Sequence, residues 1–281
     1  MAALDQTQVS TYETEIQAWR QSMDVKLRAE TGWLTLTGLY WLHEGHNTLG
    51  SDPTCDVVLP DSAPKQLGLI EFQNQRATLY VTTNAEVTVD GVVANTSVLH
   101  DDTYAEGASR VEIGSINFFI IKRSDQYAVR VRDRNNPARQ SFTGRIWFPI
   151  NPDYLITATF TPHSELKTLQ IVNIVGLLEP MGNPGYVDFT LDGHQIRLEA
   201  FDGDDDQLWF VIRDASPLTY KGGRFLYAPI NPDSTATLDF NKAYNPPCVF
   251  TPYATCPLPP KQNILSLPIE VGEKLSLDHL S

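Results

Sequence analysis

The residues best suited to do chemistry lie in one proline-rich segment, residues 239–263, which we call the cassette. Its six prolines lack the N–H donor that helices and interior strands need, so the segment must follow an irregular path. Long irregular segments in compact proteins are either functional or disordered, and the aromatic and cysteine content of this one favours order. The side chains of chemical interest are Asp239, Asn241, Tyr244, Asn245, Cys248 and Tyr253.

Two arginines could add anion binding to the cassette, because arginine binds carboxylates and phosphates through two parallel hydrogen bonds. Arg224 precedes the cassette, and Arg145 holds the equivalent position in an earlier stretch of similar sequence. The alternative is that each arginine is an internal brace, paired with Asp214 or Asp133 respectively. The predicted ligand-binding residues are Arg145, Arg224, Asn241, Asn245 and Tyr253.

An enzymatic role is the alternative to simple binding. Asp239 would act as general base and Tyr244 or Cys248 as acid or nucleophile, while Arg224 would stabilise developing charge. Such residues would form a metal-independent hydrolase of a small anionic substrate. The sequence holds no Gly-x-Ser-x-Gly, P-loop, dinucleotide-binding or His-Glu-x-x-His motif, so the common sites of those enzyme classes lose support. Whether the protein is an enzyme stays open, and no cofactor is predicted.

Metal binding is not predicted from the cysteines, histidines or acidic residues. Cys248 and Cys256 would need two further ligands, and no histidine lies between them. Buried, inert thiols are the favoured interpretation, since a catalytic thiolate would need a distant histidine. His43 and His46 fit a surface pair, and the acidic loop of residues 202–206 lacks the EF-hand pattern.

Composition limits the partners. The chain has 281 residues and a net charge of −13, which argues against nucleic acid and anionic membranes because both need a basic face. No apolar run approaches the roughly 20 residues of a membrane-spanning helix. The first residues lack the pattern of a secretory signal, so a cytoplasmic location is expected. The expected partner is a small molecule or a peptide, and the sequence does not indicate an oligomeric state.

One helix is indicated before Gly32. Ser10 and Glu13 form a capping-box pattern, and apolar residues then recur at spacings of three and four. These apolar positions are Tyr12, Ile16, Trp19, Met23 and Leu27. The single apolar stripe predicts that the helix packs against another part of the protein.

Short alternating strands with tight turns follow the helix. Val87 and Val89 lead into Asp90-Gly91, and the alternation from Val187 to Leu191 leads into Asp192-Gly193. Asp-Gly is a favourable two-residue hairpin turn. The other alternating positions are Ile116, Phe118, Ile120, Val129, Val131, Ile196, Leu198, Ala200, Leu208, Phe210 and Ile212. This pattern predicts antiparallel sheets.

The C-terminal half contains an internal repeat. One copy runs from Arg132-Asp133 through Gly144-Arg145 to Phe160, and the other runs from Arg213-Asp214 through Gly223-Arg224 to Phe240. The repeat predicts two similar β-units from about Asp133 onward. The cassette follows only the second copy, which favours function there. The alternative is a rigid lid over a sheet edge.

The N-terminal half resembles forkhead-associated (FHA) domains, which are eleven-stranded β-sandwiches that bind phosphothreonine. The resemblance lies in Gly50-Ser-Asp-Pro-Thr-Cys-Asp-Val-Val-Leu-Pro60, Gly68-Leu-Ile and Val111-Glu-Ile-Gly-Ser115. It implies the fold, but the binding residues differ. The family's Gly-Arg is Gly50-Ser51 here, its Ser-x-x-His is replaced by Ser62-Ala-Pro-Lys65, and its Asn-Gly is Asp90-Gly91. An aspartate in that loop would repel a phosphate.

The whole chain resembles the DUF1684 family, bacterial and archaeal proteins without an assigned activity. The resemblance is carried by Gly32-Trp-Leu, Gly38-Leu-Tyr-Trp41, Gly50-Ser-Asp-Pro53, Gly223-Arg-Phe-Leu226, Asp239-Phe-Asn-Lys-Ala-Tyr-Asn-Pro-Pro-Cys248 and Cys256-Pro-Leu-Pro-Pro260. These motifs imply a family and no reaction.

Together the patterns predict an all-β, mainly antiparallel protein with three parts. These are an N-terminal helix (residues 1–32), an FHA-like β-sandwich (residues 33–132) and a C-terminal β-domain of two similar units with the cassette (residues 133–281). The predicted function is binding of a small or peptidic anionic ligand in the C-terminal β-domain. The hydrolase is the alternative, and an FHA-like adaptor for protein partners is a third possibility that rests on fold analogy.

Overall fold

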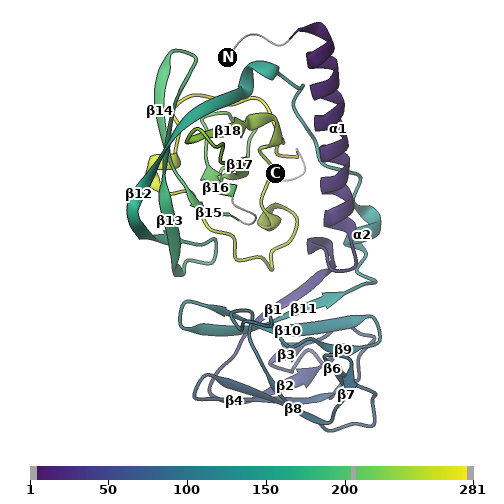
Figure 1. Cartoon of the computed structure of the whole chain (residues 1–281). Helices are drawn as coiled ribbons and strands as arrows, with labels where there is room; N and C mark the ends of the chain where they lie inside the picture. Colours follow the sequence, from purple (N-terminus) through teal and green to yellow (C-terminus); the bar gives the residue numbers. More distant parts are fainter. Residues whose placement is uncertain (1–4, 204–206, 277–281) are drawn as a thin grey trace. The chain divides into compact units, whose positions relative to one another are not determined.

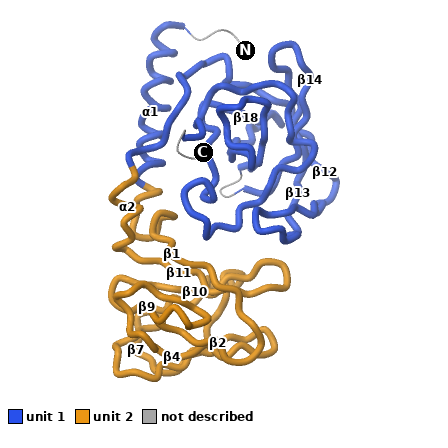
Figure 2. The backbone as a smooth tube through the Cα atoms, turned by 180° about the vertical axis from the view of Figure 1, so that it is seen from behind, with its two compact units in different colours: residues 1–25, 143–281 blue, residues 26–142 orange. Residues whose placement is uncertain are grey.

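The computed structural model describes residues 5–203 and 207–276. The chain divides into two compact units, which Figure 2 distinguishes by colour. Unit 1 comprises residues 1–25 and 143–281, and unit 2 comprises residues 26–142. Unit 2 is therefore one continuous segment. The sequence predicts that residues 1–32 form a part of their own, whereas in the structure the helix up to Val25 belongs to unit 1 together with the C-terminal half.

The N-terminal helix, α1 (Gln6–Arg28), begins earlier than the capping pattern predicted. Asp5 Oδ1 accepts hydrogen bonds from the backbone N–H groups of Thr7 and Gln8, and Gln8 Oε1 accepts one from the N–H of Asp5, all at 2.9 Å. This reciprocal arrangement satisfies N–H groups that have no partner inside the helix. The prediction that Ser10 and Glu13 cap the helix was wrong, because both lie within it. Among the described residues, no helix is long and apolar enough to cross a membrane.

Unit 2, all of whose residues are described, contains eleven strands in two sheets. They are β1 (Leu36–Trp41), β2 (Gly45–Gly50), β3 (Val57–Val58), β4 (Gly68–Gln73), β5 (Arg76–Val81), β6 (Thr88–Val89), β7 (Val92–Val93), β8 (Thr96–Leu99), β9 (Val111–Ile113), β10 (Ile116–Arg123) and β11 (Gln126–Asp133). One sheet has the order β1-β11-β10-β9-β6-β7 and the other the order β3-β2-β4-β5-β8. Only the β2–β3 pair is parallel. The short helices η1 (Trp33–Thr35) and α2 (Ala138–Ser141) complete the unit.

The predicted alternation is present in unit 2. Phe118 on β10 and Val129 on β11 are fully buried in the core shared by the two sheets, with Leu49 and Ile70 from the opposite sheet. Asp90-Gly91 joins β6 to β7 with φ angles of 51° and 81°. Two successive positive φ angles define the twisted two-residue turn that Asp-Gly favours, so this hairpin prediction is confirmed.

Unit 1 contains α1 up to Val25 and two further sheets (Figure 1). The described strands are β12 (Leu155–Val172), β13 (Leu178–Leu191), β14 (His194–Glu199), β15 (Phe201–Asp202), β16 (Gln207–Ile212), β17 (Arg224–Pro229) and β18 (Thr235–Asp239). Their orders are β14-β13-β12-β18 and β15-β16-β17, and every pair is antiparallel. The fold is thus mainly antiparallel β with one long N-terminal helix, as predicted.

The two sheets of unit 1 enclose one core. β17 lies beside β18, and β15 lies beside β13, so the sheets meet at two places. Val187, Leu198, Phe210 and Leu226 from four different strands are all buried in this core. Asp192-Gly193 joins β13 to β14 with φ angles of 49° and 77°, which confirms the second predicted hairpin turn.

The chain after β18 is irregular. It contains the short 3₁₀ helices η3 (Phe240–Lys242), η4 (Pro247–Val249) and η5 (Lys261–Asn263), and no described strand. The Asn263 side chain is fully buried, donates to the backbone oxygens of Glu199 and Val211, and accepts from the N–H of Glu199. The Asn263 side chain therefore connects the backbone of β14 to that of β16 through hydrogen bonds.

The two copies of the sequence repeat differ in structure. In the second copy, Arg224 begins β17, which pairs with β16. In the first copy, residues 134–154 contain α2 and η2 (Pro152–Tyr154) and no strand, and Trp147 makes an isolated bridge to Glu273. Both glycines before the arginines have positive φ, 118° at Gly144 and 95° at Gly223. The two copies therefore share a glycine of positive φ before the arginine and not a strand pair.

Candidate functional site

Arg224 lies wholly inside unit 1, with no exposed surface. Its Nη2 donates to Asp214 Oδ2 and to the carbonyl oxygen of Ile269, both at 2.9 Å. Its Nη1 donates to the carbonyl oxygens of Val271 and Glu273 at 2.5 and 3.2 Å. Burial lowers the pKa of the guanidinium, and Asp214 opposes that change. Arg224 therefore has the position of an internal brace, the alternative stated above, and offers no surface to a ligand.

Arg145 is also a buried arginine, but its partners differ. Its side chain is 5% exposed, and its Nη1 donates to Glu273 Oε2 at 2.6 Å. Its Nε lies 3.8 Å from Oδ1 of Asp24 on α1. The guanidinium also lies over the rings of Phe250 and Tyr244, at 4.6 and 5.8 Å from their centroids. The partners of Arg145 thus come from the helix, the cassette and the segment after it, rather than from Asp133.

Glu273 is the centre of this second cluster and was not predicted. It is 1% exposed, and burial raises its pKa to about 7, although the Arg145 guanidinium and the Asn245 N–H act to lower it. Oε2 of Glu273 accepts from the Asn245 N–H at 2.8 Å, and Asn245 Nδ2 donates to the oxygen of Lys274 at 2.8 Å. Burial also raises the pKa of Tyr244. Three predicted site residues, Arg145, Tyr244 and Asn245, are therefore brought together around Glu273.

Asp239 and Asn241 lie in a different cluster, which anchors α1. Asp239 is 5% exposed and accepts from the Tyr12 hydroxyl at 2.7 Å and the Asn241 N–H at 3.1 Å. Asn241 Nδ2 donates to the Tyr12 hydroxyl at 2.9 Å and to the oxygen of Asn151 at 2.8 Å. Burial raises the pKa of Tyr12, and Asp239 adds to the effect. These side chains satisfy one another, so the predicted general base is an internal hydrogen-bond acceptor.

The remaining cassette candidates lie apart from both clusters. Cys248 is half-buried, with its Sγ 3.6 Å from the Tyr220 hydroxyl. Tyr253 is half-buried, and its backbone N–H donates to Thr251 Oγ1 at 3.3 Å. The candidate residues of the cassette thus have different hydrogen-bond partners and do not share one polar centre.

The metal candidates are equally separate. In residues 5–203 and 207–276, no three His, Cys, Asp or Glu side chains gather closely enough to hold a metal ion. His43 and His46 are exposed, with ring nitrogens 3.7 Å from Asp56 and 3.6 Å from Glu71. Residues 204–206 of the acidic loop lie outside the described residues.

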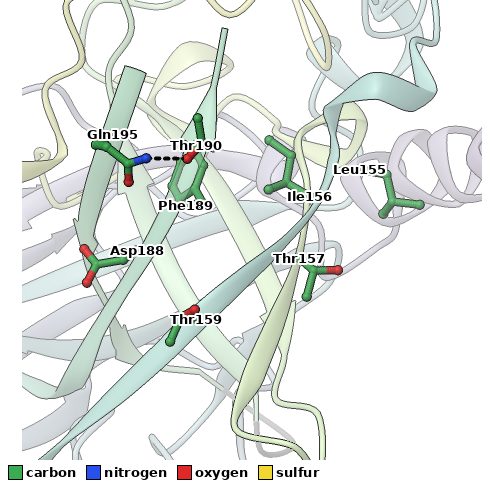
Figure 3. Close-up of a pocket in the computed structure, with 8 residues that line it drawn as sticks. All are labelled: Leu155, Ile156, Thr157, Thr159, Asp188, Phe189, Thr190 and Gln195. Atoms are coloured by element: carbon green, nitrogen blue, oxygen red, sulfur yellow. Dashed lines mark hydrogen bonds between the residues drawn. The ribbon is translucent and has the colours of Figure 1, made fainter. Parts of the chain in front are cut away.

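Unit 1 has a groove where β12 and β13 part (Figure 3). The two strands pair only from Thr159 and Asp188 to Val172 and Leu178, whereas residues 155–158 of β12 pair with β18 alone, along the opposite edge of β12. Residues 155–158 and 189–191 are consequently not paired with each other, and a groove of about 520 Å³ opens there. Its lining residues come from three strands of one sheet: Leu155, Ile156, Thr157, Thr159, Asp188, Phe189, Thr190 and Gln195.

The groove is lined by hydroxyl and amide groups. Thr157, Thr159 and Thr190 are exposed, and Gln195 Nε2 donates to Thr190 Oγ1 at 2.6 Å. The one titratable lining group, Asp188, accepts two 2.8 Å hydrogen bonds from the guanidinium of Arg197. No cassette residue lines the groove. The signal that sequence reasoning missed is the set of threonines at outward positions between buried residues of β12 and β13.

A second groove lies on unit 2. It has a volume of about 500 Å³, and its lining residues come from β4, β5, β8 and the β4–β5 turn: Glu71, Gln73, Asn74, Arg76, Thr78, Tyr80 and Val98. The Tyr80 hydroxyl donates to Glu71 Oε2 at 3.2 Å, which raises the pKa of Tyr80. The carboxylate and the phenol in this groove are thus paired with each other.

Residues 140–274 match the model of a family described as "Protein of unknown function (DUF1684)". An uncharacterized protein of Haloarcula marismortui, whose solution NMR structure is known, is 30% identical over 50% of this chain and 81% of that one, with a TM-score of 0.41. No curated protein matches the chain. The matched segment includes the cassette, Arg145, Arg224 and Glu273, but not Asp24.

Proposed function

We propose that unit 1 binds a small, polar ligand in the groove between β12 and β13. The observation that carries this proposal is the parting of two strands over a polar opening, because backbone edges and side-chain hydroxyls are then available together. The groove volume of about 520 Å³ lies within the roughly 300–1,000 Å³ of small-molecule sites. Ligands with several hydroxyl or amide groups suit such a lining, since each group can both donate and accept.

A neutral ligand suits the groove better than the anionic ligand predicted from the sequence. Asp188 is a lining residue, so an anion in the groove would lie close to a carboxylate. The guanidinium of Arg197 beside it is already bound to Asp188 through both Nε and Nη2. Arg145 and Arg224 are enclosed by their own partners and are not lining residues.

Binding is favoured over hydrolysis for the same groove. General acid–base catalysis needs a titratable group within hydrogen-bond reach of the reacting atoms. The lining offers Asp188 alone, and its two oxygens are bound to Arg197. Asp239, the general base of the alternative hydrolase, is buried against Tyr12.

We also infer that unit 2 is FHA-like and that the DUF1684 resemblance extends over the whole chain. The support for the first inference is the number of strands in unit 2, eleven in two sheets around one core. The support for the second is the set of N-terminal motifs, such as Gly38-Leu-Tyr-Trp41, outside the matched residues 140–274. Because the phosphothreonine-binding positions are replaced, this inference includes no phosphopeptide binding.

The test is a thermal-shift screen of the full chain against neutral saccharides, polyols and small amides, followed by calorimetry of any stabilising compound. A ligand that binds only the folded protein raises its melting temperature. Thr157→Tyr should fill the groove and abolish the shift, and Gln195→Ala should weaken it. Thr168→Tyr and Gln170→Ala are matched controls, because both residues are exposed on β12 and neither lines the groove.

Two results would contradict the proposal. One is that no neutral polar compound of the panel stabilises the protein. The other is that Thr157→Tyr, folded by circular dichroism, keeps the full shift of the wild-type protein.

A further inference from the structure

The cassette contains a pair of thiols whose surroundings differ from those of the third cysteine. Cys248 begins, and Cys256 ends, a nine-residue stretch, and a hydrogen bond from the Cys256 side chain lowers the pKa of the Cys248 thiol. The Tyr220 hydroxyl lies 3.6 Å from Cys248 Sγ on another side. None of the three cysteines is joined in a disulfide. The two thiols are therefore neighbours that are not joined by a disulfide.

The two thiols are not equally accessible. Cys248 is half-buried, so solvent reaches part of it, whereas Cys256 is 6% exposed. Hydrogen bonds from Cys256 and Tyr220 lower the pKa of Cys248, and burial acts against them. Since the thiolate is the reactive form of cysteine, Cys248 is the favoured nucleophile of the pair.

We propose that Cys248 and Cys256 form a reversible intramolecular disulfide, in which Cys248 attacks first and Cys256 resolves the intermediate. The oxidant is a low-molecular-weight disulfide. This inference replaces the interpretation of the two cysteines as inert thiols and is independent of the groove between β12 and β13.

The reaction proceeds in two exchange steps. The Cys248 thiolate attacks one sulfur of the oxidant, an S–S bond to Cys248 forms, and the oxidant's own S–S bond breaks to release one thiolate. The Cys256 thiol then loses its proton to that thiolate and attacks Cys248 Sγ, which expels the second half of the oxidant as a thiolate. Two protein thiols are oxidised to one disulfide, and the oxidant is reduced to two thiols once the second takes up the proton that Cys248 had lost.

The bond would close a loop that contains a partner of Arg145. Phe250, which lies 4.6 Å beneath the Arg145 guanidinium, is two residues from Cys248. The backbone N–H groups of Phe250 and Thr251 both donate to the oxygen of Pro247. Oxidation would therefore restrict the motion of the segment whose Phe250 ring packs against the Arg145 guanidinium.

Cys55 provides an internal control within the same chain. It is 7% exposed and belongs to unit 2. Burial raises its pKa, with the nearby Asp52 adding to the effect. We therefore expect Cys55 to react slowly with the oxidant and to form no disulfide within the chain.

The experiment is equilibration of the full-length protein in glutathione redox buffers, with mass spectrometry of the intact and digested protein. The wild type should lose about 2 Da and two titratable thiols, with the crosslink in the peptide that contains residues 248–256. Cys256→Ser should instead accumulate a stable glutathione adduct on Cys248, and Cys248→Ser should form neither product. Cys55→Ser should behave as the wild type. Tyr220→Phe should slow alkylation of Cys248 near neutral pH, because it removes a hydrogen bond that lowers the pKa of the thiol and so reduces the thiolate fraction.

The wild-type measurement alone can overturn the proposal, even if a variant fails to fold. It is overturned if the folded wild type keeps both thiols in the most oxidising buffer, or if Cys248 carries glutathione that Cys256 never displaces. A crosslink that includes Cys55 would also overturn it.

Discussion

The Arg145 and Arg224 clusters have similar sequences around them and different partners. Each arginine follows a glycine of positive φ, is nearly or wholly buried, and donates a hydrogen bond to one buried carboxylate. Arg224 pairs with Asp214, ten residues earlier, and with three backbone carbonyl groups. Arg145 pairs with Glu273, far away in the sequence, and lies on two aromatic rings.

The difference shows that a repeated Gly-Arg motif can brace two unlike structures. Residues 269–273 form an irregular segment without a partner strand. The Arg224 guanidinium donates to three of its carbonyl oxygens, as the N–H groups of a neighbouring strand would. At Arg145 it connects a helix to the cassette through Asp24 and Phe250. The two arginines share a residue, since Arg224 binds the backbone oxygen of Glu273 and Arg145 binds its carboxylate.

The largest predicted effect is a loss of stability that differs between the Arg224 and Arg145 clusters. Arg224→Met should reduce the free energy of unfolding by about 4 kcal/mol, because Asp214 Oδ2 and three buried carbonyl groups lose the hydrogen bonds that the guanidinium donates. Arg145→Met should cost about 2 kcal/mol, since the Glu273 carboxyl, with its pKa already raised to about 7, can become neutral. Urea unfolding monitored by tryptophan fluorescence measures both values.

The matched control for these two variants is Arg197→Met, because the Arg197–Asp188 pair is exposed. It should change stability by no more than about 0.5 kcal/mol. If Arg145→Met cost as much as Arg224→Met, the distinction between the two clusters would be wrong.

The second prediction concerns pH and the carboxyl group of Glu273. Its pKa is raised from 4.5 in the unfolded chain to about 7 in the folded protein, so the folded state binds the proton more tightly. The resulting stabilisation is fully present below pH 4.5 and is lost as pH rises through 7, by about 3 kcal/mol in total. The stability of the wild type relative to Glu273→Gln should therefore fall between pH 5 and pH 8, as measured by urea unfolding at each pH. Parallel curves for the two proteins would show that Glu273 stays charged throughout.

The smallest predicted effect lies at the helix end of the Arg145 cluster. Asp24 Oδ1 accepts from the backbone N–H of Arg145 at 3.2 Å and lies 3.8 Å from its Nε, and the Asp24 side chain is 28% exposed. Asp24→Asn keeps an acceptor oxygen, so it should cost about 0.5 kcal/mol, and less at high salt because the lost attraction is screened. Equilibrium unfolding at two salt concentrations would measure it, and a loss as large as that of Arg145→Met would mean that Asp24, rather than Glu273, is the main partner.

Local features of the fold could be predicted from the sequence. The Asp90-Gly91 and Asp192-Gly193 turns and the alternating strands around them depend on neighbouring residues, whose preferences are visible in sequence. The start of α1 was misplaced because Ser10 and Glu13 satisfy the same pattern as Asp5 and Gln8, and only the observed hydrogen bonds distinguish them.

The partners of the candidate site residues were harder to predict because they lie far away in the sequence. Nothing near Arg224 indicates that its acceptors lie at residues 269–273. Glu273 did leave a signal, because Leu265, Leu267, Ile269 and Val271 are buried at every second position, and Glu273 takes the next inward place. The groove depends on the point where the pairing of β12 with β13 ends, at Thr159 and Asp188, and no local pattern encodes that point.

The discontinuity of unit 1 has a consequence for the order in which the protein assembles during synthesis. Residues 26–142 form a contiguous unit and can fold while the ribosome is still translating the rest, as continuous domains do. The guanidinium of Arg224 has no acceptors at Ile269 and Val271 until those residues have left the exit tunnel. Tyr12 must likewise wait for Asp239. Folding of unit 1 is therefore completed late, and the nascent helix spends most of translation without the surface that it will finally cover.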